Sequence, residues 1–502
     1  MRNKRYLLTQ LMKLSFQSLM YIMLFLSFFA ILSQTNPQII NLSRTAATTM
    51  ATFAIIIGIL RFVYGGYDIE DKKPRSVFAS ILLTTLMADV VTYFQLQIMN
   101  VNPANNERLI LFGEDFWLLC GVIVLQIGII YLFATLGNRL YFKINPPQKC
   151  CIITSSQELA LHVAEKISAF RRRFFLNDVL HYECPGLEDA IREHEVVFLA
   201  GIPDTEEAQL KNFCYTHNKA MYLLAELDDV IISTAQQSIL EDTPFLYIHR
   251  SRPTLMQLAV KRFMDILLSV LGLAALSPVM LIITAVLLFS RSGPVFFRQK
   301  RATIHGKVFD IIKFRTMYQE EGESNPVSAQ ENDSRITPVG RVLRKYRLDE
   351  IPQLFNVFKG DMSIVGPRPE MLENIRKYEQ EVPEFKYRQQ MKAGITGLAQ
   401  IDGKYNTSPK DKAILDLMYI ENFSLSMDLK LMLRTLTIFF RRDSAEGFVS
   451  AKRIACPRMR TEAEVQQPVS ASEKAVPGSP KPKPESKQPQ EPAAEKPIRA
   501  AL

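Results

Sequence analysis

The 502-residue sequence predicts a membrane α-helical bundle followed by α/β domains. Three observations lead to this fold class: four apolar runs near the N-terminus, short apolar runs that alternate with helical patterns further on, and a fifth long apolar run in the middle of the chain. Hydrophobic residues make up 48% of the whole, so the average composition conceals this division. At roughly 100 to 200 residues per domain, the length indicates two to four structural units.

The first four apolar runs cover residues 14–33, 46–63, 77–98 and 116–136. Each is close to the roughly twenty residues that a helix needs to cross about 30 Å of hydrocarbon. The first run follows Arg2, Lys4 and Arg5, as in a signal peptide, but it is too long for one and no small-residue cleavage site follows. We therefore predict a four-span transmembrane bundle over residues 1–145.

Lysine and arginine gather before the first run, between the second and third, and after the fourth, whereas the other two loops offer only Arg44 and Arg108. Short loops rich in these cations stay in the cytosol, so both ends of the bundle and all that follows should be cytosolic. Asp89 lies near the middle of the third run. A carboxylate at that depth is either functional or a hydrogen-bonded link between helices, and we favour the link.

Residues 146–250 are predicted to form a cytosolic domain. Strands are expected at residues 150–154, 179–182, 196–200, 221–225 and 245–248, and helices at residues 157–170, 187–193 and 206–217. This alternation predicts a doubly wound parallel sheet. A dinucleotide-binding version would have a glycine-rich turn after its first strand, but Thr154-Ser155-Ser156-Gln157 occupies that place. A structural or regulatory role is therefore favoured over nucleotide binding.

The fifth apolar run, residues 266–289, is long enough to cross the membrane, but cations flank it on both sides and one crossing would leave one cluster outside. Ser277 and Pro278 lie near its centre. Proline lacks an N–H, so the helix should break there, and the serine hydroxyl can bond part of the freed backbone. We expect a re-entrant helix over residues 259–290, the alternative being a kinked span. The charged residues at its mouth, either snorkelling interface charges or contacts to a lipid phosphate, are Lys261, Arg262 and Asp265.

The densest group of charged and polar residues lies between residues 294 and 440. Within it, Asp349 and Glu350 are adjacent carboxylates, surrounded in sequence by Arg341, Arg344 and Arg347. One carboxylate of such a pair can attack phosphorus while its neighbour holds a divalent cation that neutralises a diphosphate. Taken alone, an Asp-Glu pair is more often a solvated surface pair.

A catalytic pair becomes the better interpretation in the context of two longer segments. These are LDEIPQLFNVFKGDMSIVGPRPE at residues 348–370 and KAGITGLAQ at residues 392–400. They resemble the bacterial sugar transferase family, the polyprenyl-phosphate sugar-1-phosphate transferases that begin capsule, exopolysaccharide or O-antigen repeat assembly. The resemblance covers residues 258–445. Together with the four spans and a Rossmann-like middle domain, the chain resembles the large membrane subtype of that family. This implies a mixed α/β catalytic domain, anchored by the re-entrant helix on the cytosolic side of a bacterial inner membrane.

The resemblance also implies residue roles. Asp349 would be the nucleophile, attacking a UDP-sugar, expelling UMP and passing the sugar phosphate to undecaprenyl phosphate. Glu350 would hold Mg²⁺, the one cofactor expected. Residues at the family's other motif positions, expected to bind substrate or else to be structural, are Arg301, Lys313, Arg315, Arg344, Asp361, Arg368, Gly394, Thr396 and Gly397. Arg368 is assigned to phosphate or nucleotide because flanking prolines fix its backbone. For the basic cluster around Arg301, a membrane-surface patch is the competing interpretation.

Two positions depart from the family pattern: Thr303 replaces the first glycine of R-x-G-x-x-G, and Ala393 replaces a proline. They leave the identity of the sugar open. The net charge of +9 does not indicate nucleic-acid binding, because the cations flank apolar membrane segments. The helical bundle could also serve as a homodimer interface. The alternative function is a non-catalytic scaffold of a polysaccharide assembly complex. The Pro/Glu/Lys-rich tail, residues 461–502, is expected to be disordered.

Overall fold

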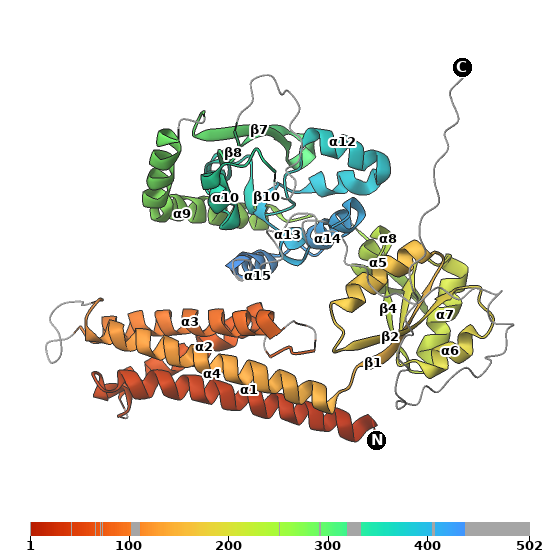
Figure 1. Cartoon of the computed structure of the whole chain (residues 1–502), viewed down its shortest axis with the longest axis horizontal. Helices are drawn as coiled ribbons and strands as arrows, with labels where there is room; N and C mark the ends of the chain where they lie inside the picture. Colours follow the sequence, from red (N-terminus) through yellow and green to blue (C-terminus); the bar gives the residue numbers. More distant parts are fainter. Residues whose placement is uncertain are drawn as a thin grey trace, which may run out of the picture.

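The computed structural model describes residues 2–41, 43–65, 67–70, 72, 74–101, 111–249, 252–290, 293–318, 333–403 and 407–436. The predicted disordered tail, residues 461–502, lies outside these ranges. Figure 1 shows four long helices lying side by side, a domain built around a sheet at one end of them, and a larger mixed domain alongside. Five of the described helices are long and apolar enough to cross a membrane.

The N-terminal helices are α1 (Arg2–Leu32), α2 (Arg44–Tyr64), α3 (Pro74–Met99) and α4 (Glu114–Ile144), with a short turn η1 (Pro37–Ile39) after the first. They pack around buried aromatic and aliphatic side chains, among them Phe28, Phe53 and Ile130. Asp89 of α3 is fully buried, and Gln126 of α4 donates to its Oδ1 at 3.3 Å. The carboxylate is therefore a link between helices, as the sequence favoured.

The middle domain contains a parallel sheet of β1 (Gln148–Thr154), β2 (Phe174–His181), β3 (Val196–Ala200) and β4 (Ala220–Leu223), in the order β2-β1-β3-β4. Helix α5 (Gln157–Ser168) packs on one face, while α6 (Leu187–Glu193) and α7 (Asp204–Thr216) pack on the other. Alternate side chains of β1 supply both cores, because Cys150 and Ile152 point to one face and Cys151 and Ile153 to the other. The predicted parallel sheet is confirmed.

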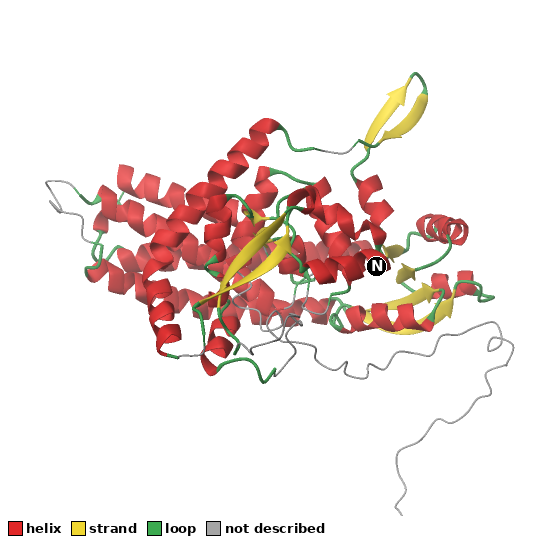
Figure 2. Ribbon diagram, turned by 90° about the horizontal axis from the view of Figure 1, so that it is seen from above, coloured by secondary structure: helices red, strands yellow, loops and turns green. Residues whose placement is uncertain are grey.

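The prediction of a fifth strand in this sheet is wrong. After α8 (Leu227–Ser233), the chain forms β5 (Gln236–Leu240) and β6 (Thr243–Tyr247), which pair with each other in antiparallel register. Glu241 adopts a left-handed φ of 57° in the tight turn between them. Because the tight turn pairs β6 with its neighbour along the chain, residues 245–248 do not add to the sheet. The hairpin stands away from the rest of the molecule in Figure 2.

Helix α9 (Leu255–Phe289) continues through Pro278, so the predicted break is a bend instead. Figure 1 shows its two halves running in different directions. Pro278 has no N–H to donate to the carbonyl of Ala274, four residues earlier, and the hydroxyl of Ser277 donates to that same carbonyl at 2.8 Å. The serine therefore supplies the replacement bond that the sequence predicted, which explains why helical geometry survives.

The remaining elements form a mixed α/β domain. They are β7 (Phe296–Ala302), η2 (Ile304–Gly306), β8 (Val308–Phe314), α10 (Pro338–Lys345), η3 (Leu348–Glu350), α11 (Gln353–Lys359), β9 (Ser363–Val365), α12 (Leu372–Glu381), η4 (Pro383–Gln390), β10 (Gly394–Thr396), α13 (Leu398–Asp402), α14 (Pro409–Glu421) and α15 (Leu425–Thr435). Strands β7 and β8 form an antiparallel ribbon, and β9 and β10 pair in parallel. The β7–β8 ribbon and the β9–β10 pair lie beside the Asp349–Glu350 turn described below.

Helices α14 and α15 of this domain contact the middle domain and the helical bundle. Ile414 and Leu417 of α14 pack against Val230 of α8, and Lys410 lies 3.0 Å from Glu226 at the edge of that contact. Leu433 of α15 packs against the apolar surface formed by α2 and α3. The middle domain and the helical bundle therefore both support the mixed domain from outside the predicted catalytic segment.

Candidate active site

Asp349 and Glu350 end a single 3-10 turn, η3, between α10 and α11. Arg347, directly before this turn, adopts φ 53°, a left-handed conformation that residues other than glycine adopt uncommonly. Pro352 follows as the N-cap of α11, with its ring-fixed φ. The two carboxylates thus sit on a tightly constrained turn, and backbone strain of this kind is concentrated at functional sites.

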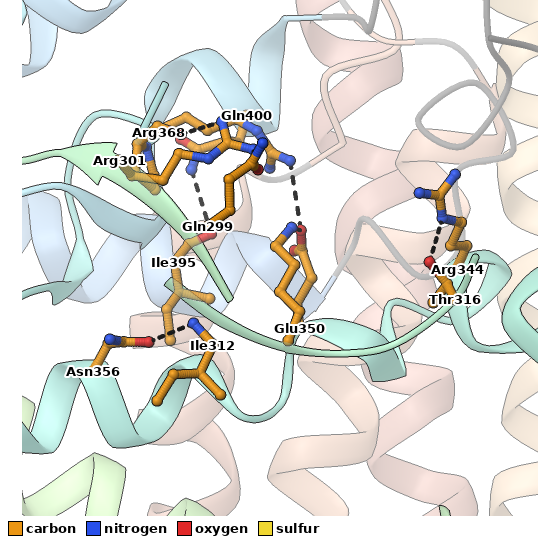
Figure 3. A network of polar contacts seen from close by, with 12 residues as sticks. Gln299, Arg301, Ile312, Thr316, Arg344, Glu350, Asn356, Arg368, Ile395 and Gln400 are labelled. Carbon is orange, nitrogen blue, oxygen red and sulfur yellow. Dashed lines mark hydrogen bonds and ion pairs between the residues drawn. The ribbon is translucent and has the colours of Figure 1, made fainter. Parts of the chain in front are cut away.

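Glu350 faces two cations. Its Oε1 lies 2.7 Å from Nζ of Lys313 and 3.5 Å from a guanidinium nitrogen of Arg368, which Figure 3 shows reaching toward it. Burial disfavours the charged carboxylate, but Lys313 and Arg368 outweigh that cost and hold the pKa of Glu350 well below its usual range. Glu350 therefore stays ionised at any physiological pH.

Asp349 behaves in the opposite way. Its side chain is buried, and burial together with the neighbouring charge of Glu350 raises its pKa, although Lys313 and Arg344 act against the rise. As the pH falls, Asp349 takes up a proton before Glu350 does. Adjacent carboxyl groups whose pKa values are pushed apart are suited to different chemical tasks.

A partly open pocket, called the Glu350 cavity, adjoins Glu350. It is lined by Arg301, Ile311, Lys313, Glu350, Gln353, Arg368, Pro369, Gly394 and Ile395. Arg301 donates to Gln299 Oε1 at 2.6 Å and to the carbonyl of Pro369 at 3.2 Å, and burial lowers its pKa to about 10, so it remains charged. Three cations around one carboxylate leave the cavity positive, which suits phosphate oxygens.

Several residues predicted to bind substrate lie outside the lining of this cavity. The guanidinium of Arg315 is buried and donates to the carbonyl of Leu287 in α9 at 3.4 Å. Arg344 donates to the hydroxyl of Thr316 at 2.9 Å, as Figure 3 shows. Asp361 pairs with Lys359 at 3.3 Å, and its carbonyl accepts from Thr303. Their contact with substrate stays a prediction.

The glycines of the KAGITG segment allow two backbones to meet. A Cβ on Gly394 would lie 2.1 Å from the amide nitrogen of Gly366, and one on Gly397 would lie 2.2 Å from the carbonyl oxygen of Gly366. The amide of Gly366 donates to the carbonyl of Thr396 at 2.8 Å, and the hydroxyls of Thr396 and Thr435 lie 2.8 Å apart. The close approach is therefore to the segment that carries Arg368, and Gly394 also lines the cavity.

The three charged residues at the mouth of α9 face the mixed domain. Lys261 lies 2.5 Å from Asp428 and donates to the carbonyl of Val365, while Asp265 accepts from the amide of Ile364. Arg262 donates to the carbonyls of Val357 and Phe358, each at 2.7 Å. These groups clamp the first half of α9 to the domain. Whether these residues also act as interface charges or contact a lipid phosphate, the two alternatives that the sequence left open, stays a prediction.

The expected Mg²⁺ requires an oxygen-rich site. Among the described residues, no group of three or more His, Cys, Asp and Glu side chains comes together. Mg²⁺ is commonly held by one or two carboxylates and completes its shell with water and substrate phosphates. Glu350, with Asp349 beside it, fits that smaller donor set, and one oxygen of Glu350 is already in contact with Lys313.

Sequence reasoning missed Glu370 and Arg388. Both line a second, partly open pocket, which shares Arg368 with the first and has Ile375 and Phe385 among its apolar walls. Glu370 ends the GPRPE segment, and Arg388 lies four residues before the KAGITG segment. Their closeness to these motifs was the available signal.

Comparison with known proteins gives a consistent result. Residues 256–442 match the family model described as bacterial sugar transferase. The UDP-N-acetylgalactosamine-undecaprenyl-phosphate N-acetylgalactosaminephosphotransferase of Aeromonas hydrophila is 41% identical over 180 residues, 35% of this chain and 43% of that protein. The UDP-glucose:undecaprenyl-phosphate glucose-1-phosphate transferase of Caulobacter vibrioides is 38% identical over 190 residues, 37% of this chain and 71% of that protein. The protein of that name from Klebsiella pneumoniae is 36% identical over 253 residues, 49% and 53% of the two chains. The match thus spans about half of the Aeromonas and Klebsiella relatives and most of the Caulobacter one.

Proposed function

Because this chain belongs to the bacterial sugar transferase family, we propose that it transfers a sugar 1-phosphate from a UDP-sugar to undecaprenyl phosphate and releases UMP. The reaction would start the assembly of an exopolysaccharide, capsule or O-antigen repeat unit. The observation that carries the proposal is the turn at residues 348–350, where a buried Asp349 adjoins a Glu350 held ionised by Lys313 and Arg368.

The reaction consists of two displacements at one phosphorus atom. A carboxylate oxygen of Asp349 attacks the β-phosphorus of the UDP-sugar, the bond from that phosphorus to the bridging oxygen breaks, and UMP leaves with the electron pair. An oxygen of undecaprenyl phosphate then attacks the same phosphorus, and the bond to Asp349 breaks. The products are undecaprenyl-diphosphate-sugar and a regenerated carboxylate.

The cations of the Glu350 cavity serve both displacements. Lys313, Arg301 and Arg368 are placed to balance the charge of the diphosphate and of the departing UMP. Mg²⁺ held by Glu350, with Asp349 beside it, would supply further charge neutralisation. The raised pKa of Asp349 makes its carboxylate a stronger base than a solvated aspartate, and the attack uses the ionised form.

We further propose that α9 enters the cytosolic face of a bacterial inner membrane and returns to it. A straight helix of its 35 residues would extend about 52 Å. Yet Lys261 in the first half bonds Asp428, and Ile283 and Leu287 in the second half pack against Phe314 of the same domain. The contacts of both halves with one domain support a helix that returns to the side it entered, and this would keep the domain within reach of a lipid phosphate. Dimerisation through the helical bundle stays a prediction.

The test uses the full chain, purified in detergent, with Mg²⁺, undecaprenyl phosphate and a panel of UDP-sugars. We expect UMP from at least one donor and its loss in Asp349→Asn. The control Asp402→Asn removes a carboxylate that pairs with Arg434 at 2.6 Å in the same domain, and it should leave UMP release unchanged. Release of UDP would indicate ordinary glycosyl transfer. If folded protein releases no nucleotide from any donor in a broad panel, the alternative function, a non-catalytic scaffold of a polysaccharide assembly complex, is favoured.

A further inference from the structure

Arg388 and Asp416 form a buried ion pair behind the active site. Arg388 lies in η4 and Asp416 in α14, and Nε of the arginine is 2.6 Å from Oδ2 of the aspartate. Their side chains are 6% and 1% exposed. A buried ion pair is weak evidence for stability, because desolvation cancels much of the attraction and well-packed apolar residues often replace such a pair without loss. The buried pair is therefore better explained by the position in which it holds the Arg388 side chain.

The second function of Arg388 is visible at its other end. One of its guanidinium nitrogens donates to the backbone carbonyl of Arg368 at 3.1 Å, and its guanidinium packs over the ring of Phe385, 4.5 Å from the centroid. The guanidinium of Arg388 thus connects α14, through Asp416, to the segment that carries a cation of the Glu350 cavity.

The backbone around Arg368 is held by two prolines and by hydrogen bonds to its carbonyls. Prolines at positions 367 and 369 fix their own φ, and the carbonyl of Pro367 accepts from the amide of Gly394 at 2.9 Å. The bond from Arg388 fixes the carbonyl of Arg368 itself. With its backbone held in this way, the Arg368 side chain extends from a defined origin toward Glu350, 3.5 Å away.

We propose that Asp416 and Arg388 are positioning residues that set the Arg368 guanidinium against Glu350 and the substrate phosphates. This inference rests on the proposed function. Asp416 has no exposed surface to offer a substrate, and its carboxylate accepts a hydrogen bond from Arg388. Arg388 has its Nε bonded to Asp416 and another nitrogen bonded to the carbonyl of Arg368, and through this second bond it can act on the backbone of Arg368.

The first test is a double-mutant cycle on UMP release by the full chain. Asp416→Asn should lower kcat about tenfold with little change in KM for the UDP-sugar, whereas in an Arg368→Ala background the same change should cost less than about twofold. Arg388→Lys keeps the charge beside Asp416, but one ammonium does not span both partners, so it should behave like Asp416→Asn. Equal losses in both backgrounds would overturn the proposal, because the pair would then act independently of Arg368.

The second test does not depend on turnover. Hydrogen exchange of backbone amides in residues 363–371 should rise several-fold in Asp416→Asn or in Arg388→Lys, whichever folds, and should not change in Asp402→Asn. Unchanged exchange in the folded variants would overturn the positioning role. If exchange rises but the wild type releases no UMP from any donor, the positioning of Arg368 is upheld and the proposed function alone fails.

Discussion

Replacing Glu350 with glutamine tests the electrostatics of the site. The pKa of Glu350 is below its usual value, so the ionised form is stabilised by folding. That contribution is complete above the ordinary glutamate pKa of about 4.5 and is lost progressively as the pH falls below it. At pH 7, Glu350→Gln should therefore lower the free energy of unfolding, since Lys313 and Arg368 then face each other without the intervening charge.

The size of the loss follows from distance and exposure. Lys313 lies 2.7 Å from Glu350, and the two side chains are 18% and 16% exposed, whereas Arg368 is 45% exposed. Removing one partner of a fully buried pair costs about 3–5 kcal/mol, and an exposed pair contributes about 0–1 kcal/mol. The site lies between these limits, so we expect a loss of about 2 kcal/mol. For a domain of 150–250 residues this lowers the thermal midpoint by about 4–8 °C.

Thermal unfolding in detergent measures this effect. Glu350→Gln, Lys313→Met and the double variant should show a coupling of about 1–2 kcal/mol at pH 7, and the difference between wild type and Glu350→Gln should narrow below about pH 4.5. An unchanged or raised midpoint in Glu350→Gln would refute the reasoning. It would show that desolvation of the carboxylate exceeds its attraction to the two cations.

Three further predictions concern the helix clamp, the pH profile and the contribution of the first half of the chain. Lys261→Met leaves Asp428 buried without its cation and should lower the free energy of unfolding by about 3 kcal/mol. Adding Asp428→Leu should restore part of this loss, as measured by thermal unfolding. If the second change restores nothing, the Lys261–Asp428 pair does not hold α9 to the domain as inferred. Because the pKa of Asp349 is raised, kcat/KM should fall on the acid side with a midpoint above the ordinary aspartate pKa of 3.8. In the residual activity of Glu350→Gln this midpoint should move to lower pH. A midpoint that does not move would contradict the coupling of the two carboxyl groups. A chain that begins at residue 252 should still release UMP. It should unfold at a lower temperature than the full chain, because α14 and α15 lose their apolar contacts with α8, α2 and α3. Complete loss of turnover in a folded, membrane-bound truncation would show that the first half of the chain is needed for the chemistry.

Asp349 and Glu350 were singled out by their resemblance to a family motif, because such a pair taken alone is more often a solvated surface pair. Asp349 and Glu350 are adjacent in the chain, and Ser277 and Pro278 are too, so one turn or one bend determines how each pair is presented. The alternation of strands and helices likewise predicted the parallel order of the middle sheet. It did not separate the hairpin strand at residues 245–248 from the sheet, because a short apolar run has the same pattern in either setting.

Contacts between distant segments had no such signal. Lys261 and Asp428 are 167 residues apart, and the pattern around Lys261 suits an interface charge as well as a buried partner. Arg388 and Asp416 lie in separate helical elements that meet only after folding. The close approach of Gly394 and Gly397 to the backbone of Gly366 also depends on tertiary structure, since the same glycines would suit an approach to a ligand.

The most direct test of the central claim is intact-protein mass spectrometry after incubation with Mg²⁺ and the accepted UDP-sugar, without undecaprenyl phosphate. We expect one sugar phosphate per chain, mapped to the peptide that contains Asp349, together with a stoichiometric burst of UMP. Both should be absent in Asp349→Asn, and adding the lipid should discharge the adduct. If the protein stays unmodified and UMP forms only when the lipid is present, the lipid phosphate attacks the donor directly and Asp349 is not the nucleophile.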